Sequence, residues 1–405
     1  MNQSLSRRAV LGAGTALFST PLLRATRMDD PAEGGSLIVL QLSGGNDGLS
    51  TIIPWADPDY QKARRGTKRS GTEVLSIDSY RGFHPALKNL HKIYGQGKLA
   101  VIEGCGYPDQ IRSHFKALDI WHSASSLGRS AGNGWIGNVS EHMQGKQASP
   151  EFVVHVGSRK PYAIHSNSHP ACSVQSPTAY RWFGADGGPG QVVDGICKEE
   201  MPPVDPRHKG RDAALAELRG VLADAKASSL RVRAAAATHE TAITFPRTGI
   251  GAQLRDVSAI VQGGIGTRIA SSVMGGFDTH AGQLGKHDRL MADLDAALGA
   301  LYFDLAGSPG GRKTTILVFS EFGRRVIENG SGGTDHGKAG PMFVLGHGVK
   351  GGLFGKHPSL TNLNNGDLGY TTDFRSVYAS LIEQCLGVDP QAILGAKYPP
   401  LRLLG

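Results

Sequence analysis

The sequence predicts an α/β fold, in which a central and mostly parallel sheet carries helices on both faces. Short apolar segments rich in β-branched residues alternate along the chain with longer segments whose apolar residues recur at helical spacing. Because the crossover between parallel strands usually contains a helix, this alternation is typical of a parallel sheet. We find no internal repeat and no convincing domain boundary, so we expect one α/β domain over residues 29–405.

The expected strands are short apolar runs that end at glycine or polar residues. They lie at residues 36–42, 99–102, 152–156, 268–273, 314–319 and 342–345. The first run ends abruptly in Ser43 to Gly48, as expected for a buried strand that enters a glycine turn.

Amphipathic spacing predicts the helices. They lie at residues 85–94, 113–121, 211–227, 283–305 and 374–386. Residues 158–210 are rich in Gly, Pro, Ser and His and show little periodicity, so we expect a long irregular excursion there.

The N-terminus predicts export by the twin-arginine route. Arg7 and Arg8 stand directly before an apolar stretch, residues 9–23, which is too short for a membrane span and only mildly hydrophobic. We therefore expect a signal peptide at residues 1–28, the twin-arginine export machinery as a partner, a periplasmic or secreted protein, and no stable transmembrane span. The residues before Ala25 fit a cleavage site poorly, so a retained anchor is an alternative, and a buried core helix is another.

The charge argues against a nucleic-acid partner. The formal net charge is +8, but four arginines precede the first acidic residue, Asp29, so the rest of the chain carries about +4. No block of like charge and no stripe of aromatic and basic residues is present. We therefore expect no nucleic-acid binding.

The four cysteines form no CxxC pair, which argues against a zinc knuckle or a thioredoxin-type site. They are Cys105, Cys172, Cys197 and Cys385. An oxidising compartment allows one or two disulfides, and we favour a Cys172–Cys197 pair across a loop-rich stretch.

Acidic and histidine residues follow the predicted strands or lie in glycine-rich loops. They are Asp47, Asp278, His280, Glu321, Asp335 and His336. Ligands of open α/β sheets bind beyond the C-terminal strand ends, so we expect these side chains to converge on one edge. Carboxylates with imidazoles suit zinc, manganese or iron, and oxygen-rich corners also accept magnesium or calcium. The sequence therefore predicts a divalent-metal site, although each piece alone could be a capped turn or a helix N-terminal charge.

A second group of candidates lies in residues 110–115, where Ser113 is expected near the start of a helix. Beside a metal its hydroxyl could act as a nucleophile, and a simple N-cap is the equally supported alternative. Its neighbours Arg112 and His114, together with Arg324, complete the catalytic candidates. The two arginines could clamp phosphate or sulfate oxygens, or could simply be solvated.

These segments resemble the exported domain-of-unknown-function family numbered 1501, which is grouped with the alkaline phosphatase and sulfatase superfamily. The matching segments are residues 42–49 (LSGGNDGL), 112–115 (RSHF), 277–280 (FDTH), 320–324 (SEFGR), 332–337 (GGTDHG) and 373–378 (DFRSVY). They follow one another in order over nearly the whole mature chain. The resemblance implies an alkaline-phosphatase-like fold with a one- or two-metal site.

The resemblance also implies roles for single residues. In the superfamily an Asp after the first strand binds metal, a residue at a helix start is the nucleophile, and later Asp and His residues complete the metal shell. These roles correspond to Asp47, Ser113, Asp278, His280, Asp335 and His336. One departure stands out, because the superfamily places Asp-His after a late strand and this chain has Glu321-Phe322. His336 could replace the missing imidazole, or one metal site could be missing.

Together these observations predict an exported metal-dependent hydrolase of a phosphate or sulfate ester, with a small anionic ester or a sugar-derived compound as substrate. A non-catalytic exported binding or assembly protein on the same scaffold is the alternative, favoured by the Glu321-Phe322 departure. A sugar-active hydrolase that uses paired carboxylates without a metal is a third.

Overall fold

The computed structural model describes residues 35–178, 180 and 209–405, without the side chains of residues 209–219, 221 and 222. One compact unit spans Glu33–Gly405. The expected signal peptide at residues 1–28 lies outside the described residues, so its cleavage and its export route stay predictions. Among the helices of the described residues, none combines the length and the apolar character that a membrane crossing requires.

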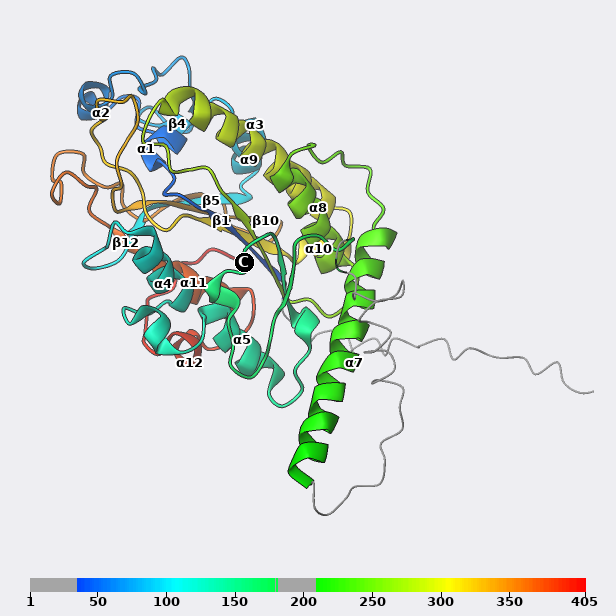
Figure 1. The fold of residues 1–405 in the computed structure, drawn as a ribbon. Coiled ribbons are helices and arrows are strands. Elements are labelled where there is room, and N and C mark those ends of the chain that lie inside the picture. Colours follow the sequence, from blue (N-terminus) through cyan, green and yellow to red (C-terminus); the bar gives the residue numbers. More distant parts are fainter. Residues whose placement is uncertain (1–34, 179, 181–208) are drawn as a thin grey trace, which may run out of the picture. The chain divides into compact units, whose positions relative to one another are not determined.

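A nine-stranded sheet forms the centre of the fold, in the order β11-β5-β10-β9-β1-β8-β6-β7, with β12 paired to β5 (Figure 1). Its strands are β1 (Leu37–Leu42), β5 (Leu99–Gly106), β6 (Val153–Val156), β7 (Cys172–Val174), β8 (Ile269–Met274), β9 (Thr315–Phe319), β10 (Gly340–Gly346), β11 (Gly352–Phe354) and β12 (Thr372–Asp373). A second sheet has the order β2 (Ile52–Ile53), β4 (Gly82–Phe83) and β3 (Leu75–Ser76). Every pairing in the large sheet is parallel except those of β10 with β9 and β5.

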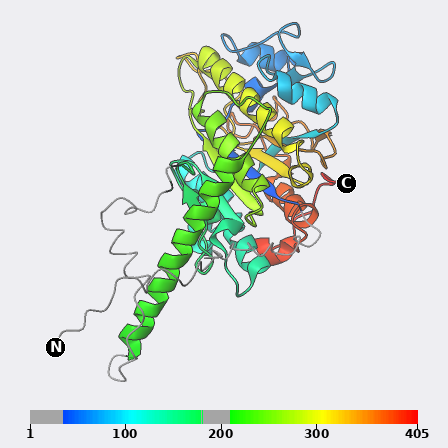
Figure 2. The same cartoon turned by 90° about the vertical axis from the view of Figure 1, so that its right-hand side faces the viewer.

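Helices cover both faces of this sheet, which confirms the predicted fold class. They are α1 (Gly48–Thr51), α2 (Pro58–Ala63), α3 (Lys88–Gly95), α4 (His114–Ser123), α5 (Trp135–Gln144), α7 (Lys209–Thr238), α8 (Gly249–Gln262), α9 (Gln283–Leu305), α10 (Pro309–Arg312), α11 (Phe374–Gln384) and α12 (Pro390–Leu394). Short 3-10 turns add η1 (Gly128–Ala131), η2 (Pro150–Phe152) and η3 (Tyr162–Ile164). Figures 1 and 2 show α3, α8 and α9 on one side of the strands and α4, α5 and α11 on the other.

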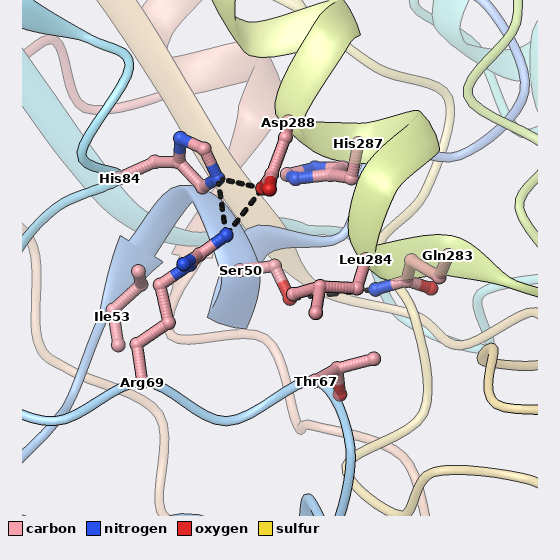
Figure 3. A pocket seen from close by; sticks show the side chains of 9 residues that line it. All are labelled: Ser50, Ile53, Thr67, Arg69, His84, Gln283, Leu284, His287 and Asp288. Atoms are coloured by element: carbon pink, nitrogen blue, oxygen red, sulfur yellow. Dashed lines mark hydrogen bonds and ion pairs between the residues drawn. The ribbon is translucent and has the colours of Figure 1, made fainter. Parts of the chain in front are cut away.

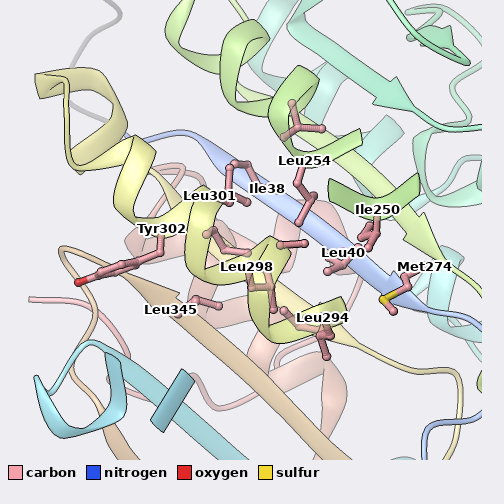
Figure 4. Close-up of a cluster of buried hydrophobic side chains, with 14 of the residues drawn as sticks. Ile38, Leu40, Ile250, Leu254, Met274, Leu294, Leu298, Leu301, Tyr302 and Leu345 are labelled. Carbon is pink, nitrogen blue, oxygen red and sulfur yellow. The ribbon is translucent and has the colours of Figure 1, made fainter. Parts of the chain in front are cut away.

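The central strand β1 shows why the chain adopts this layered form. All six of its residues are buried, as expected for a parallel strand with helices on both sides. Ile38 and Leu40 point into the core beneath α8 and α9 (Figure 4), whereas Leu37 and Val39 point into the opposite core. Alternate side chains of this one strand therefore pack into two different hydrophobic cores, one on each face of the sheet.

Several elements differ from the sequence-based expectation. The helix expected at 211–227 is α7, which extends to Thr238 because alanines, the best helix formers, occupy its last turns. The helices α5 and α8 were not expected, and α8 begins in Gly249–Gly251, where glycine weakens the helical signal. The stretch 158–210 contains β7, and its residues 181–208 lie outside the described part.

The predicted disulfide joins Cys172 to Cys197, which lies outside the described residues, so it stays a prediction. Cys172, Cys105 and Cys385 are buried and form no disulfide with one another. Burial in an apolar environment raises the pKa of the Cys172 thiol to about 11, so this sulfur stays protonated and unreactive.

A buried ion pair fixes the turn that follows β1. Arg64 donates to both carboxylate oxygens of Asp47, with Nη1–Oδ2 and Nη2–Oδ1 distances of 2.5 and 3.0 Å. Ser50 and Gln283 also donate to Asp47 Oδ2, at 2.8 and 2.5 Å. Burial raises the pKa of Asp47, but the charge and hydrogen bonds of Arg64 outweigh burial and hold the pKa well below its ordinary value. Asp47 is thus fully engaged within the protein.

We expect Asp47→Asn to lower the free energy of unfolding by about 3–5 kcal/mol, because it leaves the buried Arg64 charge without a counterion. Urea unfolding measures this change. The exposed Asp224→Asn on α7 is the matched control and should shift stability by less than about 0.5 kcal/mol. The double variant Asp47→Asn/Arg64→Met should lose less than the sum of the two single changes, and full additivity would contradict a coupled pair.

Candidate metal centre

The candidate site lies where several strands end at one edge of the sheet. The strands β1, β5, β8 and β9 run in the same direction, so the segments that follow them meet at this edge. Since β10 is antiparallel to its neighbours, the loop that precedes it arrives at the same edge. The loop before β10 is the same segment that follows β9, so four chain segments that are distant in sequence come together, as ligand sites of α/β sheets require.

Four side chains meet there, and we call them the His/Asp cluster: His114, Asp278, His280 and His336. Ligand atoms of His114, Asp278 and His336 all lie within 4.8 Å of one another. His336 Nε2 lies 3.1 Å and His280 Nε2 2.9 Å from Asp278 Oδ1. The Nε2 atoms of His280 and His336 are 3.0 Å apart, and His114 Nε2 lies 3.5 Å from Asp278 Oδ2.

An acceptor holds the outer nitrogen of each imidazole. His114 Nδ1 lies 2.9 Å from Glu321 Oε1, and His336 Nδ1 lies 2.9 Å from the carbonyl oxygen of Arg112. His280 Nδ1 lies 3.4 Å from Asp335 Oδ1. An acceptor at Nδ1 keeps the proton there and turns the lone pair of Nε2 toward the cluster, which is the arrangement of metal-ligating histidines.

The contacts inside the cluster fit a bound cation. Imidazole lone pairs 3.0 Å apart and beside a carboxylate repel one another unless a proton or a cation lies between them. Zinc–nitrogen distances of about 2.0–2.1 Å correspond to about 3.3 Å between the nitrogen ligands of a tetrahedral site. The donor set of three imidazoles and one carboxylate therefore suits a divalent transition metal.

Glu321 lies one layer behind the cluster, which corrects its prediction as a metal ligand. Its side chain is buried, and its Oε1 accepts hydrogen bonds from His114 Nδ1 and from the backbone N–H of Gly44 at 2.9 and 2.8 Å. The hydrogen bond to Glu321 is the main reason why the pKa of His114 is raised. His114, predicted as a catalytic residue, belongs to the cluster instead.

The Phe322 ring stands where the resemblance leads one to expect an imidazole. Its centroid lies 4.8 Å from the ring centroids of both His114 and His336. The aromatic side chain thus supports two cluster imidazoles by packing, and His336, from a later position in the same loop, brings an imidazole nitrogen to the cluster.

Arg324 is buried and ties the loops of the site together. Its guanidinium donates to the carbonyl oxygens of Gly44 and Gly45 after β1, and to that of Phe277 after β8, the last two at 2.7 and 3.1 Å. It also donates to Thr334 O at 2.8 Å and to Asp278 Oδ1 at 2.6 Å. These donors all point inward, so Arg324 is not the anion clamp that we predicted.

The arginine also sets the charge of the central carboxylate. Burial raises the pKa of Asp278, but hydrogen bonds from Arg324 and His336 outweigh burial and lower the pKa to about 2. Asp278 is therefore ionised and ready to hold a cation at neutral pH.

The loops approach one another so closely that a glycine is required. Gly44 has a φ of 122°, and a Cβ added there would collide with the backbone nitrogen of Asp278.

The remaining predicted residues lie around the cluster rather than in it. Asp335 is exposed and accepts from Asn329 Nδ2 at 3.0 Å, which places it beside His280 as an outer partner. Ser113 is the N-terminal cap residue of α4, and its side chain makes no capping hydrogen bond. The structure does not bring Asp47 to the cluster, because Arg64 occupies its carboxylate.

A separate polar group that the sequence did not reveal lines a small pocket near Asp47 (Figure 3). His84 Nε2 lies 2.8 Å from Asp288 Oδ1, and Arg69 pairs with the same oxygen. Burial lowers the pKa of the neighbouring His287 to about 4, so this imidazole is neutral at pH 7. No spacing in the sequence indicates these contacts, since their partners come from distant segments.

We expect Asp278→Asn, His114→Ala and His336→Ala each to weaken zinc binding by at least about 10-fold, because the first removes the negative charge of the ligand carboxylate and the other two each remove a ligand nitrogen. Calorimetric titration of chelator-treated protein with zinc measures the affinity. His142→Ala, which changes an exposed histidine on α5, should bind zinc like the wild type. Unchanged affinity in the three cluster variants would show that the cluster is not a metal site.

We expect Arg324→Met to lower the free energy of unfolding by at least about 3 kcal/mol, because several buried carbonyl oxygens lose their donor at a cost of about 1–3 kcal/mol each. The exposed Arg289 on α9 offers the control Arg289→Met. The control should change stability by less than about 0.5 kcal/mol. Equal stabilities of the two variants in urea unfolding would refute the structural role of Arg324.

Comparisons with known proteins find one family model and solved structures of low similarity. No curated protein matches the chain. Among the similar solved structures are a 2-O GAG sulfatase (8% identity, TM-score 0.32) and a putative sulfatase from Bacteroides thetaiotaomicron VPI-5482 (9% identity, TM-score 0.29). Each comparison covers 79% of this chain but only 66% of the solved chain, just under two thirds of its length. The model of the family described as "Protein of unknown function (DUF1501)" matches residues 214–394, and this is the family that the motifs resemble.

Proposed function

We propose that this protein is an exported, divalent-metal-dependent hydrolase of a phosphate or sulfate ester. The observation that carries the proposal is the His/Asp cluster, in which three imidazoles and one carboxylate face one another while acceptors hold the outer imidazole nitrogens. The imidazole-rich donor set favours zinc or manganese over calcium or magnesium, which prefer oxygen ligands.

The protein groups around the cluster have distinct tasks in this proposal. Asp278, His114, His280 and His336 would hold the cation, which when bound polarises an ester oxygen as a Lewis acid. Glu321 keeps the proton of His114 on Nδ1 and thereby orients its ring. The Arg112 guanidinium, whose side chain is 41% exposed, can donate to the anionic oxygens of a substrate.

Ser113 is the candidate nucleophile of this proposal. It precedes His114 directly and caps α4 without a capping hydrogen bond, so its hydroxyl is uncommitted among the described residues. A serine held beside a bound cation can be activated for attack on an ester.

A non-catalytic metal- or ligand-binding protein on the same scaffold is the second candidate. Two observations favour it: Ser113 makes no hydrogen bond to any described residue of the cluster, and Glu321 serves as an outer partner instead of a ligand. Metal binding without turnover would be the signature of this candidate.

We expect zinc- or manganese-loaded protein to hydrolyse 4-nitrophenyl phosphate or 4-nitrophenyl sulfate, and a chelator or Asp278→Asn to reduce the rate to background. Ser113→Ala should lower kcat by at least about 100-fold if its hydroxyl attacks the ester. The exposed Ser130→Ala is the matched control and should keep the full rate. A metal-loaded protein that turns over neither these esters nor a panel of sugar sulfates would support the binding protein instead.

A further inference from the structure

Two partly exposed arginines border the His/Asp cluster. The carbonyl oxygen of Arg112 accepts from His336 Nδ1 at 2.9 Å, and the backbone N–H of Arg325 donates to Asp335 O at 3.0 Å. The Arg112 and Arg325 side chains are 41% and 35% exposed. Both guanidinium groups are therefore carried by the segments that build the cluster, and both can reach solvent.

A single buried carboxylate lies between the two guanidinium groups. Asp367 Oδ2 is 3.7 Å from Arg112 Nη1, and Asp367 Oδ1 is 3.6 Å from Arg325 Nε. The Asp367 side chain is fully buried, and neither of its oxygens accepts a hydrogen bond from the described residues. A buried carboxylate is costly unless opposite charge compensates it, so Asp367 draws the two arginines together by charge.

The N–H donors of these arginines remain largely unused. A guanidinium carries five N–H donors, and in the described part of the chain Arg325 donates one of them, to Asn365 O at 3.2 Å, while Arg112 donates none. Arg64 and Arg324, in contrast, donate to carboxylates and carbonyl oxygens on all sides. The two kinds of arginine thus differ in their free hydrogen-bonding capacity.

Positive charges outnumber negative ones around Asp367. Burial raises the pKa of Asp367 and outweighs Arg112, Arg325 and Lys338, which all lower it. Arg325 also acts on Asp335, so three cations face two carboxylates. Oxyanion groups bind where free N–H donors lie within an excess of positive charge. The paired N–H donors of a guanidinium match the oxygens of sulfate, phosphate and carboxylate.

We propose that Arg112 and Arg325 form a subsite for an oxyanion group of the substrate, in which Asp367 positions the two guanidinium groups and Lys338 adds positive charge. The inference rests on the proposed function only in assigning the anion to the substrate. The anion-binding property itself belongs to the arginines and does not require a bound metal.

Sulfate binding to chelator-treated protein tests the subsite separately from hydrolysis. We expect calorimetric titration with sodium sulfate at low ionic strength to show binding that weakens at least 10-fold in Arg112→Gln and in Arg325→Gln, and that is lost in the double variant. Arg255→Gln, which changes an exposed arginine on α8, is the matched control and should bind like the wild type. Thermal unfolding of every variant verifies that it is folded.

Two results would overturn the subsite: no sulfate binding by the wild type, or equal affinities of the wild type and both arginine variants. Neither result depends on ester turnover, so the hydrolase proposal and the subsite proposal can fail independently. The zinc-loaded protein then separates two origins of the anion. A sulfate affinity that rises several-fold with zinc identifies the reacting ester group, and an unchanged affinity identifies a second anionic group on the substrate.

Discussion

The geometry of the site depends on the hydrogen bonds that the buried guanidinium of Arg324 donates. It donates to carbonyl oxygens of the loops after β1 and β8 and of the loop before β10, and it also donates to the Asp278 carboxylate. These loops contain glycines and no regular structure, so their positions would otherwise cost conformational entropy. One buried charge with several acceptors orders them together and leaves Asp278 ionised at the centre of the cluster.

A second network of buried polar side chains, built around Asp47, also holds these loops in place. Gln283, at the start of α9, donates to Asp47 and accepts from Thr334 Oγ1 at 2.6 Å. Asp47 in turn holds Arg64, which donates to the carbonyl oxygens of Val326 and Arg325 at 2.6 and 2.9 Å. The acidic residue after the first strand thus acts as a structural anchor, and the candidate metal centre is built from residues of later loops.

The arginines near the site fall into two groups, buried ones that neutralise carboxylates and partly exposed ones whose charge can reach solvent. Arg64 and Arg324 are buried and neutralise the carboxylates of Asp47 and Asp278. Arg325 directly follows Arg324 in the chain, yet its side chain is a third exposed and faces Asp367. Successive residues in an extended segment point to opposite sides, so one arginine stabilises the loops while its neighbour remains available to an anion.

The sequence by itself determined the architecture and the edge at which the chemistry lies. The buried strand β1, the long helix α9 and the polar residues after each strand are visible in the sequence because hydrophobic periodicity and glycine turns are local properties. It did not determine that β10 runs antiparallel, because strand direction depends on pairing with β5 and β9.

Only the tertiary structure decided which of the candidate residues face one another. His114 was expected beside a nucleophile, and it joined the cluster because Glu321, 207 residues away, holds its Nδ1. Asp47 left the predicted ligand set because Arg64 neutralises it in the interior. No sequence pattern indicated a role for Asp367, because its role depends on the two arginines that face it in the folded protein. The physical reason is the same in each case: the charge state and role of a side chain depend on partners that folding brings from distant parts of the chain.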